Sequence, residues 1–160
     1  MLFVAQIAEV VASALRAAEI DGRVAVLDEP RLARAVRDRG RDVVVIGAKL
    51  RGLKRTGGIR ICGTGQALPL ADESVGALVT VGLGELEAWE AQLSRFIDAV
   101  TDGGLIVCVD RAVPHEMSRR ALCGGLAEIE QRQAGRTIVT SGRVRKLVGS
   151  NGQIGSPGRR

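Results

Sequence analysis

Acidic side chains follow two stretches of the sequence that are predicted to be buried β-strands. Asp28 ends the run 23–28, and Asp110 comes directly after the run 105–109. Because the carboxyl ends of parallel strands meet at one edge of a sheet, both carboxylates are predicted at the edge where open α/β sheets bind ligands. They could form a small acidic pocket for a ligand. The alternative is that each of them caps the helix or turn that follows.

Histidine and cysteine are the other residue types that could do chemistry. His115 is the only histidine and follows Pro114 at a predicted helix start. It could accept a proton near neutral pH, and the alternative is a capping or solvent-exposed side chain. Cys62, Cys108 and Cys123 show no paired spacing typical of a metal site. We therefore expect no metal site and no catalytic residue, and we expect reduced, buried thiols in a cytoplasmic protein.

Basic residues give the chain a net charge of +5 and a pI of about 9.8. The densest basic stretch, a candidate contact surface, contains Lys49, Arg51, Lys54 and Arg55. A phosphate-contacting face could combine it with Arg60, Arg143, Arg145 and Lys146. The alternative is a solvated surface. Aromatic residues are only 2% of the chain, so any contact with nucleic acid would be directed at the backbone and sensitive to salt.

The elements that position these residues belong to one domain. The 160 residues are 46% apolar and 26% charged, which is typical of a single soluble domain with an aliphatic core. We predict the domain over 1–148 and a flexible tail rich in Gly, Ser, Pro and Arg over 149–160. The first ten residues lack a basic segment and contain Glu9, so we expect neither a signal peptide nor a membrane span.

Hydrophobic periodicity predicts alternating helices and strands, which is typical of parallel strands joined by crossover helices. Helices are predicted over 1–20, 30–40, 86–100 and 114–124, with one or two helical turns within 49–58. Parallel strands are predicted over 23–28, 42–46, 59–62, 76–81 and 105–109, and an antiparallel hairpin over 128–133 and 137–148. The leading helix, 1–20, has an apolar stripe that could pack on the sheet or serve as a surface for a partner or a dimer.

Two stretches carry a resemblance to a known family. Residues 68–79 read LPLADESVGALV, and residues 102–110 read DGGLIVCVD. They resemble the second half of class I S-adenosylmethionine-dependent methyltransferases, where an LPF-D-SFD-V stretch leads into the fourth strand and a GG turn into the fifth. The resemblance extends over roughly residues 22–148. It implies a doubly wound, mainly parallel methyltransferase-like (Rossmann-like) sheet, flanked by helices and ending in an antiparallel hairpin.

The departures from the family pattern fall on the positions that would face the cofactor. After the VLD strand end the family has a GCGTG loop, whereas here Asp28 passes directly to Glu29 and a proline. Gly47 replaces the acidic residue that would bind the ribose hydroxyls, and Thr64 stands where a GDA motif would hold the adenine. Gly76 replaces the aspartate that opens the fourth strand. The degenerate positions are therefore Asp28, Gly47, Thr64 and Gly76.

These departures together predict that no cofactor binds at the usual place. Each lost charge-assisted hydrogen bond costs about 1.5–3 kcal/mol. We expect a catalytically inactive methyltransferase-like domain that acts as a protein-binding, scaffold or regulatory component, with a protein partner and self-association into a dimer. One alternative is an active S-adenosylmethionine-dependent methyltransferase with a remodelled cofactor loop. The other is a basic accessory domain that binds nucleic acid.

Overall fold

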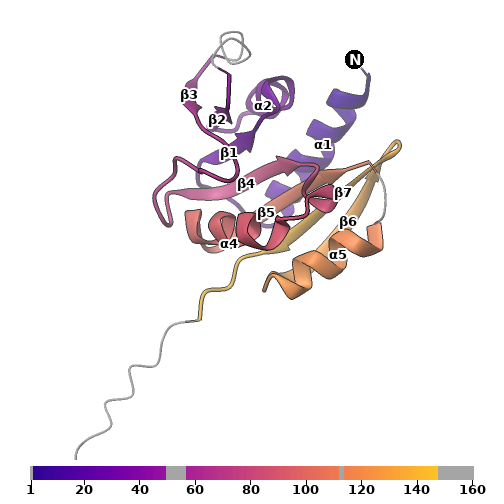
Figure 1. The fold of residues 1–160 in the computed structure, drawn as a ribbon. Helices are drawn as coiled ribbons and strands as arrows, with labels where there is room; N and C mark the ends of the chain where they lie inside the picture. The colour runs from indigo at the N-terminus through magenta and orange to yellow at the C-terminus, as the bar shows by residue number, and fades with distance from the viewer. Residues whose placement is uncertain (1, 50–56, 112–113, 148–160) are drawn as a thin grey trace, which may run out of the picture.

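A seven-stranded sheet forms the centre of the molecule, in the order β3-β2-β1-β4-β5-β7-β6. The computed structural model describes residues 2–49, 57–111 and 114–147. The strands are β1 (Val24–Leu27), β2 (Val43–Gly47), β3 (Ile59–Cys62), β4 (Val75–Val81), β5 (Val100–Asp110), β6 (Ala127–Ala134) and β7 (Thr137–Arg143). The first five pair in parallel, and β7 pairs antiparallel with both β5 and β6. The predicted doubly wound sheet with a terminal hairpin is confirmed (Figure 1).

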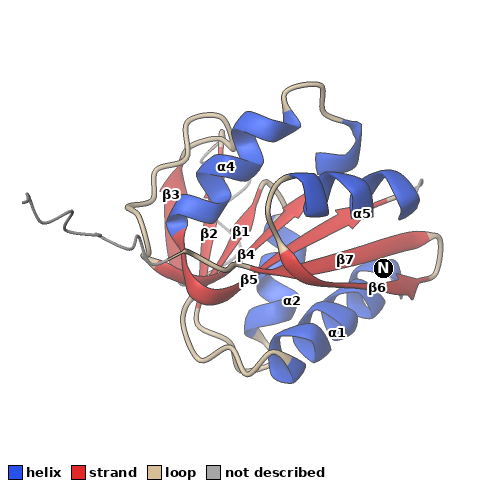
Figure 2. Cartoon of the chain, turned by 90° about the horizontal axis from the view of Figure 1, so that it is seen from below, coloured by secondary structure: helices blue, strands red, loops and turns tan. Residues whose placement is uncertain are grey.

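Helices cover both faces of the sheet (Figure 2). One face carries α1 (Leu2–Ala17) and α2 (Pro30–Arg37), and the other carries the short 3-10 helix η1 (Leu83–Glu85), α4 (Trp89–Ala99) and α5 (Pro114–Cys123). None of the helices in the described residues is long and apolar enough to cross a membrane. Most of the stretch 49–58, for which one or two helical turns were expected, lies outside the described residues.

Alternation along the strands divides the interior into two cores. Val24 and Val26 of β1 pack against α1 and α2, whereas Ala25 and Leu27 pack toward α4. All four side chains are buried, because a parallel strand covered on both faces exposes neither set of its alternating residues. This explains why β1 is read in the sequence as a continuous apolar run.

The leading helix packs on the sheet, which was one of the two roles predicted for its apolar stripe. Ala8, Val11 and Leu15 of α1 are fully buried. The helix contacts β5, β6 and β7, and the Arg132 guanidinium of β6 donates a hydrogen bond of 2.8 Å to the Ser13 hydroxyl. In Figure 1 the indigo α1 lies beside the orange and yellow terminal hairpin. The first helix of the described chain therefore packs against its last two strands.

Several predicted boundaries are wrong. The strand expected over 105–109 spans Val100–Asp110, and the helices expected to reach residues 20 and 40 end at Ala17 and Arg37. Leu86 was expected on the apolar face of a helix over 86–100, but α4 begins at Trp89, and Leu86 is extended and exposed. The final strand was expected to reach residue 148, but β7 ends at Arg143. Beyond it, Val144 keeps two backbone hydrogen bonds of 2.8 Å to the Gly103-Gly104 turn, where the pairing of β5 with β4 is irregular.

Candidate functional site at the carboxyl edge of the sheet

The turn after β1 contains only Asp28 and Glu29 before α2 begins at Pro30. Asp28 has a positive φ of 54°, a conformation that aspartate tolerates better than most residues. Its amide donates to the Ile46 carbonyl at 2.8 Å, and its Oδ1 accepts from the Ala48 amide at 3.4 Å. Asp28 therefore links the carboxyl end of β1 to that of β2.

The carboxyl ends of β2 and β3 are held by backbone and side-chain hydrogen bonds. The Gly63 amide donates to the Gly47 carbonyl at 3.1 Å. The Thr64 hydroxyl accepts from the Ala67 amide at 3.0 Å, so this side chain holds its own turn. A β-carbon at Gly63 would lie 2.5 Å from the Pro69 ring, which requires glycine at that position. The exit of β3 is therefore a short turn that the Thr64 side chain holds, and the exit of β2 is bonded to it through Gly47.

Packing explains why position 76 is a glycine, independently of any cofactor. A β-carbon at Gly76 would lie 2.9 Å from the Gly22 Cα, so β4 touches the backbone of the segment that leads into β1. The Gly76 amide also donates to the Arg23 carbonyl at 2.9 Å. An aspartate, which the resemblance would place at position 76, does not fit here unless Gly22 moves.

A cavity of about 750 Å³ opens at the carboxyl ends of β4 and β5. It lies beside the position where the strand order reverses, between β1 and β4, where open α/β sheets bind their ligands. Its apolar lining is Phe3, Val4, Ile7, Leu32, Val81 and Val109. Its remaining lining is Gly82, Thr137 and the charged Glu29, Glu85, Asp110, Arg111 and Arg136.

Asp110 is the one buried charged residue among those that line the cavity. It is 3% exposed, and its Oδ1 accepts a hydrogen bond of 2.9 Å from the Gly84 amide. Its Oδ2 has no hydrogen-bond partner among the described residues. Burial raises the pKa of this carboxyl, the Gly84 hydrogen bond opposes that rise, and the nearby Glu85 charge adds to it. A buried carboxyl with a shifted pKa is typical of functional sites.

The other charged lining residues are not engaged in ion pairs within the part of the chain that the structure describes. Glu29, Glu85, Arg111 and Arg136 form no salt bridge there, whereas most other described arginines do. Phe3 is 59% exposed, so an apolar ring also stands at the opening of the cavity. The cavity therefore offers an apolar lining and unpaired charges of both signs.

The prediction that Asp28 and Asp110 share an acidic pocket agrees with the structure for Asp110 and is wrong for Asp28. Asp110 lines the cavity, but Asp28 does not, because its carboxylate is turned to the exit of β2. Glu29 and Glu85 supply the other acidic groups, and the sequence analysis missed both. Their only signal was that each follows a predicted strand within a few residues. His115 lies exposed in the first turn of α5 and does not line the cavity.

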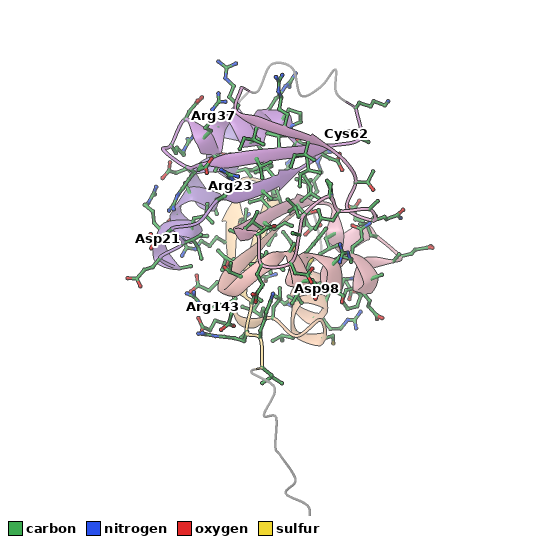
Figure 3. All side chains as sticks on the ribbon, turned by 90° about the vertical axis from the view of Figure 1, so that its left-hand side faces the viewer. Asp21, Arg23, Arg37, Cys62, Asp98 and Arg143 are labelled. Carbon is green, nitrogen blue, oxygen red and sulfur yellow. The ribbon has the colours of Figure 1, made fainter. Side chains whose placement is uncertain are left out.

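The predicted combined basic face is wrong. Arg60 is on β3 at one edge of the sheet, while Arg143 is on β7, beyond four intervening strands (Figure 3 shows Arg143 far from Cys62 of β3). Arg143 and Arg145 pair with Glu128 at 2.8 and 2.5 Å, and Lys146 pairs with Glu73 at 3.2 Å. Each of these cations therefore already has an ion-pair partner. Of the candidate surface, Arg51, Lys54 and Arg55 lie outside the described residues, and Lys49 is exposed.

The expectation of three buried thiols is also wrong in two cases. All three cysteines are free, but only Cys108 is buried. Cys62 ends the edge strand β3, and Cys123 ends α5, so neither is covered by a neighbouring element. Burial raises the pKa of the Cys108 thiol well above its usual range. In the described ranges no group of three or more His, Cys, Asp or Glu side chains could hold a metal ion.

Comparison with known proteins places this geometry in a structural class. No protein-family model and no curated protein matches the chain. Among solved structures, the glycopeptide N-methyltransferase MtfA superposes with a TM-score of 0.72 at 13% identity, over 87% of this chain and 89% of that one. The chain has a methyltransferase-like fold. At this level of identity the likeness shows the fold alone.

Two further structures share the methyltransferase-like fold. An S-adenosylmethionine-dependent methyltransferase from Thermotoga maritima has a TM-score of 0.68 at 14% identity, over 84% of this chain and 87% of that one. A methyltransferase from Haloferax volcanii, in complex with the activator protein Trm112, has a TM-score of 0.66 at 13% identity, over 90% and 98% of the two chains. This second structure holds a partner protein on a methyltransferase-like fold.

Proposed function

We propose that this methyltransferase-like domain does not bind S-adenosylmethionine at the first strand-to-helix turn and acts by binding a protein partner, as a scaffold or regulatory component. The observation that carries the proposal is the turn after β1. It contains only Asp28 and Glu29, and Asp28 is hydrogen-bonded across to the exit of β2. A backbone that wraps closely around a cofactor needs glycines with open space beside them. This turn has neither.

The neighbouring exits support the same proposal. β2 ends at Gly47, which offers no carboxylate to a ribose, and the Thr64 hydroxyl is already occupied by the Ala67 amide. Each lost charge-assisted hydrogen bond costs about 1.5–3 kcal/mol, and micromolar affinity is worth only about 8 kcal/mol in total. Losing two or three such contacts leaves little affinity for the nucleoside.

The protein partner is supported by the form of the fold and by one neighbour. The Haloferax volcanii methyltransferase is bound to an activator protein, so a fold of this kind can present a surface to a second chain. A domain of this class that has no cofactor of its own would contribute to a cell mainly through such contacts.

Calorimetric titration with S-adenosylmethionine tests the proposal. We expect no saturable heat below about 1 mM ligand. A single-site isotherm with low-micromolar affinity would contradict it. Capture with the complete chain, compared with a Phe3→Ala, Leu122→Ala variant, tests the partner, since these are two strongly exposed apolar side chains of the described residues.

The cavity favours a second candidate, an active methyltransferase with a remodelled cofactor site. Its position at the carboxyl ends of β4 and β5 and its buried Asp110 are features that a catalytic centre could use. Under this candidate the titration shows binding, and Asp110→Asn weakens it. Asp28→Asn is the matched control at the same sheet edge, because Asp28 does not line the cavity.

A further inference from the structure

The apolar wall of the cavity lies on the face of the sheet that α1 and α2 cover (Figure 2). Val109 belongs to the core on this face, and Val81 lies on the same side of β4, because strand residues two positions apart share a face. The helices add Phe3 and Ile7 from α1 and Leu32 from α2. The cavity volume of about 750 Å³ lies within the range of small-molecule pockets, about 300–1,000 Å³.

The carboxylate of Asp110 takes no part in this wall. Asp110 follows Val109 by one position, so its side chain is directed to the opposite face, where the Gly84 amide of η1 donates to Oδ1 at 2.9 Å. Its Oδ2 is buried and has no accessible surface. A ligand against the wall therefore meets the other charges of the lining.

Two arginines come together at one corner of the cavity. The antiparallel register of β5 with β7 places Arg111, at its next step, opposite Thr137. Arg111 is two positions after Val109 and so on the same face, and Arg136 precedes Thr137 in the turn between β6 and β7. Both arginines are exposed, and neither guanidinium has an ion-pair or hydrogen-bond partner among the described residues.

The turn between β6 and β7 brings this corner to the apolar wall. A β-carbon on Gly135 would lie 3.4 Å from the Phe3 ring, so the turn that contains Arg136 packs against the first turn of α1. A cationic corner and an apolar surface therefore adjoin each other in one cavity.

The acids of the lining lie toward the other side. Glu29 follows β1 and Glu85 follows β4, so along the edge β1-β4-β5-β7 the charges change from negative to positive. Glu85 belongs to η1, which packs on the opposite face, and its charge raises the pKa of Asp110. On the face that carries the apolar wall, two arginines therefore outnumber one acid, Glu29.

We propose that the cavity binds a small carboxylate with an apolar body, whose anionic group lies between the guanidinium groups of Arg111 and Arg136. A guanidinium binds a carboxylate through two parallel hydrogen bonds, so two arginines at one corner suit a single anionic group. The apolar body lies against Phe3, Ile7 and Leu32. This site goes beyond the proposed function, since it needs neither S-adenosylmethionine nor a protein partner.

Calorimetric titration of the complete protein with 4-phenylbutyrate tests this site, and the backbone amide signals of Val81 and Thr137 locate it. The matched probes are 4-phenylbutan-1-ol, which lacks the charge, and 4-phenylbutylamine, which reverses it. We expect saturable binding of the acid that shifts both signals, and at least about fivefold weaker binding of the other two probes.

Substitution of the two arginines tests the anionic group. Arg111→Gln and Arg136→Gln should each weaken binding of 4-phenylbutyrate about three- to tenfold. Both variants should fold, because both side chains are exposed. Arg31→Gln is the matched control, since it removes the same charge from an exposed position at the start of α2 that does not line the cavity. It should change the affinity less than about twofold.

The absence of saturable binding by the acid would overturn the proposal, as would equal or tighter binding of the alcohol or the amine. An unchanged affinity in both cavity variants, or binding that shifts neither amide signal, would also overturn it. These results are independent of the S-adenosylmethionine titration, so the failure of one proposal can be told from the failure of the other.

Discussion

Glu116 is held by two arginines of its own helix. Its carboxylate accepts from Arg119 at 3.0 and 2.7 Å and from Arg120 at 2.8 Å. These hydrogen bonds lower the pKa of Glu116 to about 2, with Arg119 the larger cause. Because Arg120 also binds two carbonyls next to η1, this cluster joins α5 to the segment that follows β4.

The lowered pKa of Glu116 predicts a pH-dependent contribution to stability. A carboxyl whose folded pKa lies below its unfolded value stabilises the protein fully above the unfolded pKa, near 4.5, and loses that contribution as the pH falls toward about 2. Wild type should therefore lose more unfolding free energy than Glu116→Gln between pH 6 and pH 2. Urea denaturation at several pH values measures the difference, and parallel curves for the two proteins would contradict the prediction.

Single residues show how far the sequence could predict the site. Asp110 was found because a carboxylate at a strand end is a strong signal, but the same signal selected Asp28, whose carboxylate serves a backbone contact. Only the conformation of a two-residue turn separates them. Glu29 and Glu85 could not be chosen from the sequence, since their one signal, a position a few residues after a predicted strand, is too weak to separate them from the other acids.

At the scale of elements, β4 and the segment before β1 meet through backbone alone. Gly22 and Gly76 approach so closely that a β-carbon on either would lie within 3.0 Å of the other residue. Such contacts leave no room for adjustment, because both partners are main chain. The pairing of β1 with β4, which sets the point where the strand order reverses, depends on this approach.

Gly76→Ala should therefore destabilise the protein by about 1–3 kcal/mol, the usual range for overpacking. Gly65→Ala is the control, because its β-carbon would meet the flexible end of the Gln92 side chain at 2.7 Å, which can move. Its cost should be below about 1 kcal/mol. Thermal and urea denaturation of both variants measure these values, and similar costs for the two would show that β4 relaxes at this contact.

Elements were predicted well where periodicity is strong and less well at their ends. The apolar run of β2 and the stripe of α1 each predicted the right element and the right burial. Leu86 fitted a helical face by spacing, yet the η1 turn separates it from α4. Cys62 fitted a buried strand, but β3 is an edge strand whose side chains are largely exposed. Position within the sheet, which decides exposure, is not a local property of sequence.

For the whole molecule, strand order could be predicted only through the resemblance to a family, because alternation alone does not fix which strands are neighbours. The proposed domain limit at residue 148 can be tested directly. A chain truncated after residue 148 should keep the Tm of the complete protein within about 1 °C, since no apolar element is expected beyond it. Differential scanning fluorimetry measures this, and a drop of several degrees would contradict the limit.

A chain truncated after residue 142 is the matched control. It removes Arg143, whose guanidinium donates to the Ala18 and Gly103 carbonyls and pairs with Glu128. It also removes buried Val144. This shorter chain should melt clearly below the other two.

The seating of α1 on the terminal hairpin affects how the protein is made. Ser13 is bonded by Arg132, which is synthesised 119 positions later. The buried stripe of the helix is covered in part by β6 and β7. At a ribosomal rate of about 5–20 residues per second, the nascent chain lacks these contacts for on the order of ten seconds after α1 has been synthesised. We expect the part of the stripe that faces β6 and β7 to stay exposed until the hairpin has been synthesised.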